Sequence, residues 1–171
     1  MQDSDSTSSA PPIWLNSMRH IRAAAVFFSI LMYPVCFNCA DVAFDFVADT
    51  HLIVVPVTIN GHGPYRFLFD TGATNTILSS VVADSLKIPV RRRGTIFTAG
   101  GNVAVTIRTM RTLNVGKAQL ENVEIAVGDF DLMKRLNVDG LLGGDYLRTF
   151  RVDIDYNGKT VKIEQVLPSN R

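Results

Sequence analysis

From about residue 41 onward, short apolar runs alternate with turn-forming residues, and this pattern constrains the fold more than any other feature. Residues 52–59 are rich in Ile and Val, residues 60–64 are Asn-Gly-His-Gly-Pro, and the run Tyr65–Phe69 follows. Turn formers between two such runs indicate a β-hairpin. Because Pro56 has no N–H to donate, we expect its strand to lie at a sheet edge or to be bulged there.

The same alternation continues toward the C-terminus. Residues 94–98 and 103–108 flank Ala99-Gly100-Gly101-Asn102, which predicts a second hairpin with a glycine-rich tip. We expect further strands at 113–115, 120–127, 151–155 and 160–166, and short helices at 130–136, at 145–150 and from Ser79 or Ser80 to Leu86. Many short strands with a few single-turn helices predict an all-β fold, a mainly antiparallel barrel or sandwich.

The charge balance restricts the class of partner. The chain has 17 basic and 16 acidic residues and a formal net charge of +1. Such a balance creates no long-range field that would attract phosphates or an anionic membrane surface. We therefore expect no nucleic-acid partner. The basic run Arg91–Arg93 is interpreted as a solvated loop.

The first 40 residues differ in composition from the rest. Residues 1–17 are rich in Ser, Asp and Pro and are expected to form a disordered extension. Residues 18–40 contain basic residues, an apolar run and then the small residue Ala40, which is the layout of a cleavable secretory signal. A retained membrane anchor over residues 23–40 is the alternative. Either reading predicts an extracytoplasmic domain over residues 41–171, periplasmic or secreted, with a possible tether to the inner membrane.

The motif that carries chemistry is Asp70-Thr71-Gly72, which directly follows the apolar run Phe67–Phe69. A carboxylate at the end of a buried strand, on a turn whose glycine exposes backbone N–H groups, can be hydrogen-bonded and partly desolvated. Such an environment tunes a carboxyl group for acid–base work. We interpret Asp70 as a catalytic carboxylate.

With these motifs the sequence resembles the retropepsin-like aspartic peptidases, in particular the single-lobe proteins of bacteria. The matching features span about residues 45–166: F-L-F-D-T-G-A, the A-G-G-N hairpin, L-L-G followed by G-D-Y-L, and the closing run R-V-D-I-D-Y-N-G-K-T-V-K-I. The resemblance implies an acid-protease-like closed barrel with short helices and one lobe per chain. No metal and no cofactor are expected.

The resemblance also implies roles for individual residues. Asp70 would be the catalytic acid, Thr71 would grip the active-site loop of a partner chain, and Gly72 would supply backbone donors near the catalytic pair. The flap that closes over a bound peptide would be formed by Ala99, Gly100 and Gly101. The segment that threads beneath the active-site loop would consist of Leu141, Leu142 and Gly143.

Stoichiometry predicts a second chain. Peptide hydrolysis by carboxylates needs one group as general base on a water molecule and another, protonated, to polarise the carbonyl. Two carboxylates sharing a site cannot both ionise, so one keeps its proton. This chain has a single D-T-G. We therefore predict an aspartic endopeptidase that acts on peptides or proteins as a two-fold homodimer.

Four alternatives compete with this reading. Residues 153–158 with Glu164 satisfy the formal pattern of a calcium loop, but the flanking runs alternate like strands, which favours a β-hairpin. The serines at 79 and 80 lie in no nucleophile elbow, and the histidines at 51 and 62 are too sparse for a zinc site. A dimeric peptide-binding or assembly module that keeps the fold without turnover is the alternative from a different class.

Overall fold

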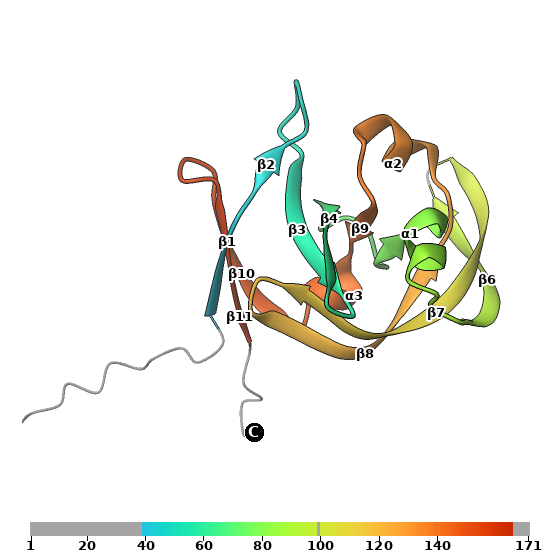
Figure 1. The fold of residues 1–171 in the computed structure, drawn as a ribbon. Coiled ribbons are helices and arrows are strands. Elements are labelled where there is room, and N and C mark those ends of the chain that lie inside the picture. Colours follow the sequence, from blue (N-terminus) through green and yellow to red (C-terminus); the bar gives the residue numbers. More distant parts are fainter. Residues whose placement is uncertain (1–38, 99, 166–171) are drawn as a thin grey trace, which may run out of the picture. The chain divides into compact units, whose positions relative to one another are not determined.

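A computed structural model describes residues 39–98 and 100–165 (Figure 1). The expected extension 1–17, the flap residue Ala99, and all but the last two residues of the segment 18–40 lie outside the described residues. Among the helices that are described, none is long and apolar enough to cross a bilayer.

Strands dominate the described chain. They are β1 (Cys39–Ala43), β2 (Asp45–Phe46), β3 (Ile53–Ile59), β4 (His62–Phe69), β5 (Ile77–Leu78), β6 (Val90–Thr98), β7 (Gly101–Val115), β8 (Ala118–Val127), β9 (Gly140–Leu142), β10 (Phe150–Asp155) and β11 (Thr160–Gln165). The helices are α1 (Ser80–Ser85), α2 (Asp131–Leu136) and α3 (Gly144–Leu147).

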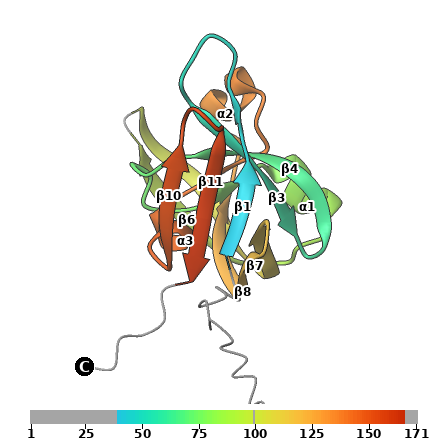
Figure 2. The ribbon, with the colours of Figure 1, turned by 90° about the vertical axis from the view of Figure 1, so that its left-hand side faces the viewer.

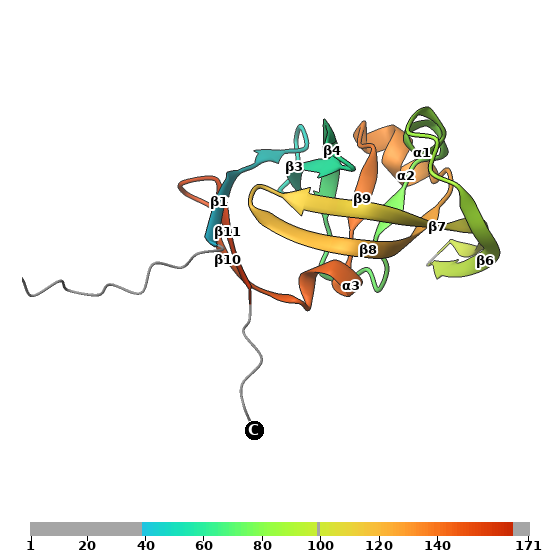
Figure 3. The ribbon, with the colours of Figure 1, turned by 60° about the horizontal axis from the view of Figure 1, so that its bottom comes forward.

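The larger sheet closes on itself. Its strand order is β2-β3-β4-β9-β5-β8-β7-β6. An additional pairing of β3 with β7 closes the strands β3, β4, β9, β5, β8 and β7 into a barrel. The β7–β8 hairpin is its longest and runs across the whole barrel (Figure 3). A separate sheet has the order β1-β11-β10 (Figure 2). The predicted all-β closed barrel with short helices is confirmed.

The first predicted hairpin is formed by β3 and β4, but its turn is shorter than expected. Asn60 and Gly61 have φ of 52° and 80°, and His62 already belongs to β4. Two successive residues with positive φ make the tight turn that matches the twist of a hairpin, so no longer loop is needed. The Asn60 side chain also accepts a hydrogen bond from the backbone N–H of Arg111 at 2.8 Å.

Pro56 lies on a stretch of β3 that is paired on one side only, as predicted for a residue without an N–H. On one side β3 pairs with β4 throughout. On the other side it pairs with β2 at residues 53–54 and with β7 at residues 58–59, and Pro56 lies between these contacts, exposed. The bulge itself is displaced toward the turn, between Val57 and Ile59.

Two local predictions were wrong in extent or type. The helix expected at 145–150 is α3, which begins at Gly144 and ends at Leu147, because Phe150 is drawn into β10, where it is buried and packs on Tyr146. The run Arg91–Arg93 is not a loop but part of β6. Since β6 is the last strand of its sheet, all three arginines remain exposed.

The remaining helices and the C-terminal hairpin follow the prediction. Ser79 is the N-cap of α1, its side chain accepting from Val82 N at 3.4 Å. Helix α2 begins one residue after the predicted start. Strands β10 and β11 flank a turn in which Asp155 Oδ1 accepts from the N–H groups of Asn157 and Gly158 at 2.9 and 3.0 Å. The hairpin reading of this segment is therefore confirmed.

The last three residues of β4, 67–69, are buried on both faces of the strand, since successive side chains point to opposite faces. Phe67 and Phe69 belong to the main core, together with Leu142 of β9 and Tyr146 of α3. Leu68 belongs to a second apolar cluster on the other face. Other members of this second cluster include Ile77 of β5, Leu141 of β9, the β6–β7 residues Ile96, Val103, Val105 and Ile107, Met133 and Leu136 of α2, and the loop residue Ala73.

Candidate active site

Asp70 follows directly on the buried end of β4. Phe69, the last residue of β4, pairs in parallel with Leu142 of β9, and the next backbone N–H, that of Asp70, donates to Leu142 O at 3.1 Å. The position of Asp70 is therefore set by the ladder between two buried strands. A carboxylate mounted in this way has little backbone freedom.

One oxygen of the Asp70 carboxylate is held by its own loop. Oδ1 accepts hydrogen bonds from the N–H groups of Gly72 at 2.8 Å and Ala73 at 3.2 Å. No residue in the described part of the chain donates to Oδ2. A Cβ atom at Gly72 would lie 3.2 Å from Oδ1, so glycine allows the loop to close this tightly around the carboxylate. The partly buried carboxylate is thus oriented and still has an oxygen available for chemistry.

Thr71 lies between Asp70 and Gly72 and is exposed in the single chain. Its side chain makes no hydrogen bond within the described residues. The hydroxyl is therefore free to bond outside its own chain.

The segment 141–143 passes directly against the active-site loop. Leu141 and Leu142 lie in β9, between β4 and β5. A Cβ atom at Gly143 would come within 2.5 Å of both the carbonyl carbon and the carbonyl oxygen of Asn75, which are backbone atoms. Only a residue without a side chain fits this contact, and the two backbones are in direct van der Waals contact here.

Asp145 holds the far end of the active-site loop, a role that the sequence analysis did not assign. Its Oδ1 accepts from Thr76 Oγ1 at 2.6 Å, and both of its oxygens accept from Thr76 N at 2.9 Å. Thr76 Oγ1 in turn accepts from Gly143 N at 3.1 Å. The only sequence signal was an acidic residue in the first turn of a short helix, which by itself says nothing about a partner 69 residues away.

The β6–β7 hairpin carries the residues assigned to the flap. Its strands meet at the pair Thr98 and Gly101, and Thr98 Oγ1 accepts from Gly100 N at 3.2 Å and donates to Gly101 O at 2.8 Å. Gly101 has φ of 111°, which favours glycine. No hydrogen bond between described residues joins this tip to the Asp70 loop. Ala73 of that loop and the hairpin residues Ile96 and Val103 near the tip belong to the same apolar cluster.

Comparison with known proteins places this geometry in a family. The family model described as aspartyl protease matches residues 55–146, more than half of the chain, and the match includes Asp70 and its loop. The chain belongs to the aspartyl protease family. A comparison with curated protein sequences finds no match.

Three solved structures resemble this chain, one of them with a TM-score above 0.5. A retropepsin-like aspartic protease from Rickettsia conorii is 20% identical, with a TM-score of 0.51, and the alignment covers 74% of this chain and 90% of that one. The EIAV protease complexed with the inhibitor HBY-793 is 24% identical with a TM-score of 0.47, covering 61% and 91%. The retroviral protease-like domain of Ddi1 from Leishmania major is 20% identical with a TM-score of 0.47, covering 71% and 99%. The recognition of a retropepsin-like fold is confirmed by the family match and the first of these structures.

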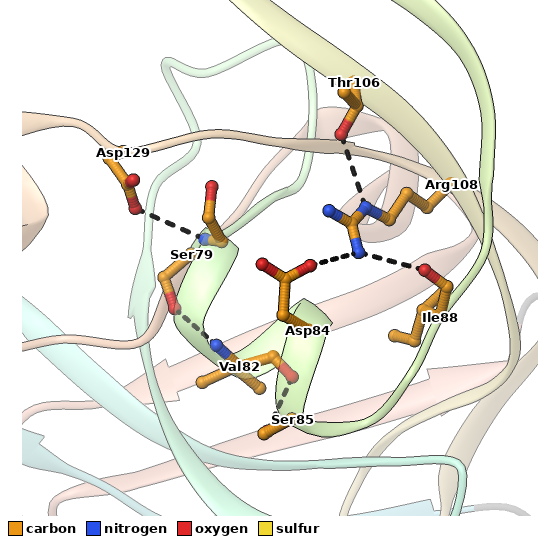
Figure 4. A network of polar contacts seen from close by, with 9 residues as sticks. Ser79, Val82, Asp84, Ser85, Ile88, Thr106, Arg108 and Asp129 are labelled. Atoms are coloured by element: carbon orange, nitrogen blue, oxygen red, sulfur yellow. Dashed lines mark hydrogen bonds and ion pairs between the residues drawn. The ribbon is translucent and has the colours of Figure 1, made fainter.

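The base of the β6–β7 hairpin in this aspartyl protease is anchored by a buried arginine that the sequence analysis also missed. Figure 4 shows Arg108 of β7 reaching toward Asp84 of α1, with Nη1 donating to Asp84 Oδ1 at 2.8 Å and to Ile88 O at 2.9 Å. Its Nε donates to Thr106 Oγ1 at 3.3 Å. Because α1 follows β5, which comes after the Asp70 loop, this cluster connects that part of the chain to the base of the β6–β7 hairpin.

Titratable groups beyond these add little to the protease site. Burial raises the pKa of Tyr146, whose hydroxyl donates to Ala118 O at 2.9 Å, so this phenol stays neutral and structural. No group of three or more metal-binding side chains occurs among the described residues.

Proposed function

We propose that this protein is an aspartic endopeptidase whose catalytic pair consists of two Asp70 residues, one from each of two identical chains. The observation that carries the proposal is the asymmetry of the Asp70 carboxylate. Its Oδ1 is held by two backbone N–H groups, whereas Oδ2 accepts no hydrogen bond from the described chain. A second carboxyl group or a water molecule is the natural partner for that oxygen.

The chemistry follows from two carboxyl groups that share one proton. The ionised Asp70 takes a proton from a water molecule, and the resulting hydroxide attacks the peptide carbonyl carbon. The protonated Asp70 of the other chain donates its proton to the carbonyl oxygen, so a neutral tetrahedral diol forms. When the C–N bond breaks, the first Asp70, now protonated, gives its proton to the amine nitrogen, and the ionised Asp70 of the other chain takes a hydroxyl proton from the diol, so that the products are a carboxylic acid and an amine. One carboxyl group is protonated again at the end of the cycle.

Neighbouring residues supply the other parts of this proposal. Gly72 and Ala73 N–H groups hold the carboxylate in place. The exposed Thr71 hydroxyl is proposed to bond the active-site loop of the partner chain. The flap hairpin, with Gly100 and Gly101 at its tip, is proposed to cover the bound peptide and exclude water, and Ala99 is assigned to the same tip from the sequence.

The test compares the wild-type chain with the Asp70→Asn variant. The full chain is incubated with a proteome-derived peptide library between pH 4 and 7, and new termini are identified by mass spectrometry. We expect cleavage by the wild type and none by Asp70→Asn, with the same circular dichroism spectrum for both. Specific activity of the wild type is expected to fall on dilution, since one chain holds half of the pair. Cleavage that persists in Asp70→Asn contradicts the proposal, and peptide binding without cleavage by the wild type supports the binding module instead.

We also propose that the protein works outside the cytoplasm. The support is the composition of residues 18–40, which fits a secretory signal or an anchor over 23–40. N-terminal sequencing of the protein from fractionated cells tests this, and recovery of the full-length chain from the cytoplasm alone contradicts it.

A further inference from the structure

A hollow of about 410 Å³ lies at the base of the β6–β7 hairpin. Its walls are formed by Asn60, residues 86–89, Arg91, residues 109–111 and Asn122. None of these residues belongs to the Asp70 loop, to the segment 141–143 or to the tip of the hairpin. The volume is within the range of roughly 300–1,000 Å³ that is usual for sites that bind small molecules. The hollow is therefore a candidate binding site separate from the active site.

The walls of this hollow carry positive charge and no carboxylate. Lys87, Arg91 and Arg111 line it, all three are exposed, and none forms an ion pair with another described residue. The acidic residues within two positions of the lining residues are all engaged outside the hollow, namely Asp84 with Arg108, Glu121 with Gln119 and Glu124 with Arg92.

A β-bulge places Arg91 at this hollow. Val90 of β6 pairs with Arg108 of β7, and Arg92 pairs with Ile107, so Arg91 is an extra residue without a partner across the ladder. A bulge turns the side chain of the extra residue away from the direction that regular pairing would give it. The local irregularity of β6 therefore coincides with the residue that lines the hollow.

The opposite wall shows a second irregularity. The ladder between β7 and β8 skips Arg111 and Asn122, and Asn122 has φ of 53°. Asn60 Oδ1 accepts from the N–H groups of Arg111 and Thr112 at 2.8 and 3.1 Å, which orients this side-chain amide. Its Nδ2 group donates to no described residue. Asn60 thus adds an available neutral donor to the cationic groups.

The remaining wall of the hollow is apolar. Ile88 and Met110 are buried, Leu86 is partly buried, and all three line the hollow. A bare ion would leave this surface in contact with water. An anion with an organic part would cover it as well, and the burial of apolar surface would add to the binding free energy.

We propose that this hollow binds a small organic phosphate. The phosphoryl group, which carries nearly two negative charges at neutral pH, is held by the guanidinium groups of Arg91 and Arg111 and by the ammonium group of Lys87. The organic part lies against the apolar wall. Since the net charge of the chain is only +1, recognition depends on contacts inside the hollow and not on long-range attraction.

This inference goes beyond the proposed function, because the hollow contains no residue of the proposed catalytic pair and binding does not depend on peptide hydrolysis. A ligand in the hollow contacts the segment between α1 and β6 and also β7. The same segment is already joined to β7 by the bond from Arg108 to Ile88 O (Figure 4). A ligand that binds the folded chain stabilises it, so we expect it to raise the thermal unfolding temperature.

The experiment measures binding to the full chain by isothermal titration calorimetry at low salt and about pH 7.5, where a phosphate monoester is a dianion. Three probes separate charge from apolar contact, namely phenyl phosphate, inorganic phosphate and benzoate. We expect phenyl phosphate to bind most tightly, and the other two to bind about tenfold more weakly. Inorganic phosphate lacks the apolar part, and benzoate carries a single charge. Affinity for phenyl phosphate is expected to fall as salt is added.

Single substitutions locate the site. Arg91→Gln and Arg111→Gln are each expected to raise the dissociation constant of phenyl phosphate about tenfold, because each removes a charge-assisted hydrogen bond. Arg93→Gln is the matched control, since Arg93 is an exposed arginine of the same strand that does not line the hollow. Arg93→Gln and Asp70→Asn are both expected to stay within about twofold of wild type. Thermal unfolding of each variant without ligand verifies that its fold is retained.

A measurement on the wild-type chain needs no variant. The side-chain amide signals of Asn60 and Asn122 are followed by NMR during the phenyl phosphate titration. We expect both to shift with the dissociation constant found by calorimetry, because both residues line the hollow.

Four results would overturn the proposal. The first is the absence of both heat and amide shifts with phenyl phosphate up to about 10 mM. The second is an equal loss of affinity in Arg93→Gln and Arg111→Gln, which indicates diffuse attraction, and the third is a loss in Asp70→Asn, which places the ligand at the active site. The fourth is binding of an oligo-aspartate peptide but of neither phosphate, which assigns the hollow to an acidic protein segment. None of these results changes the proposed function, because peptide cleavage is not part of the measurement.

Discussion

Thr76 and Asp145 are 69 residues apart in the sequence and are joined by three hydrogen bonds. Thr76 is fully buried, and its backbone N–H and hydroxyl both donate to the one carboxylate. The same carboxylate accepts from Tyr146 N at 2.8 Å. Asp145 thereby connects the end of the active-site loop to the first turn of α3.

Replacing Asp145 is expected to loosen the active-site loop. Asp145→Ala leaves the buried donors of Thr76 without an acceptor, which costs about 3 kcal/mol of unfolding free energy. Asp145→Asn keeps one acceptor oxygen and is expected to cost roughly half as much. Urea unfolding and cleavage rate are the measurements, with Asp155→Ala in the exposed hairpin turn as control. Equal losses of unfolding free energy for Asp145→Ala and Asp155→Ala would contradict the role of the Asp145 carboxylate in holding the loop.

Gly143 and Gly144 are adjacent, but we expect replacement by alanine to destabilise the protein much more at Gly143 than at Gly144. Gly143→Ala brings a methyl group within 2.5 Å of Asn75 backbone atoms, so the active-site loop must move, at a cost of about 3 kcal/mol or more. For Gly144→Ala the nearest atom is Ala73 O at 3.3 Å, and we expect a loss below about 1 kcal/mol. Thermal unfolding and activity of both variants provide the comparison. A well-folded, fully active Gly143→Ala protein would contradict the close backbone contact.

Arg108 is expected to contribute far more to stability than Arg92, another ion-paired arginine of the β6–β7 hairpin. Arg108→Met leaves Ile88 O and Asp84 without their donor and is expected to cost about 2–3 kcal/mol. Under the proposed function it should also raise KM more than it lowers kcat, because the base of the β6–β7 hairpin loses its anchor to α1. Arg92→Met is the control, since Arg92 lies 3.6 Å from Glu124 and both side chains are exposed, so its loss is expected to stay below about 0.5 kcal/mol. Similar losses of unfolding free energy for Arg108→Met and Arg92→Met would argue against the anchoring role of Arg108.

Tyr146 is expected to limit stability at alkaline pH. Burial raises the pKa of Tyr146 in the folded chain above the ordinary value of about 10. Above pH 10 the unfolded chain loses this proton while the folded chain retains it, so stability falls as pH rises. Tyr146→Phe lacks this contribution and is expected to be less stable than wild type at pH 8, with a smaller decline from pH 10 upward. Parallel stability curves for the two proteins from pH 8 to 11 would show that the phenol does not contribute.

Thr71 is expected to act between chains. Its hydroxyl is exposed and makes no hydrogen bond in the described part of its own chain. Thr71→Ala should therefore weaken the dimer by about 1–2 kcal/mol through two symmetry-related bonds, while the unfolding of the dissociated chain stays unchanged. Thr74→Ala, an exposed residue of the same loop, serves as the control. Unchanged dimer affinity in Thr71→Ala would remove the proposed bond across the interface.

Local sequence was sufficient to determine much of this architecture. Alternation of side chains gave the strands around the β3–β4 turn, and the positive φ of Asn60 and Gly61 explains why Asn-Gly was such a strong turn signal. The N-cap at Ser79 could also be predicted from the sequence, because capping depends on residues three apart. The candidate Asp70 was identified in the same way, from a carboxylate placed directly after an apolar run.

Tertiary structure decided what depends on residues far apart in the sequence. The barrel closes through two residue pairs between β3 and β7, Thr58 with Asn114 and Ile59 with Leu113, and no local pattern specifies such a pairing. The helix α3 ends early because Phe150 is buried against Tyr146, which overrides its local preference. The hydrogen-bond partners of Asp145 and Arg108 could likewise not be predicted from the sequence, since a hydrogen bond across 69 or 24 residues depends on the folded path of the chain. Periodicity determines which face of an element is apolar, but only packing brings two distant faces, and the polar groups on them, into contact.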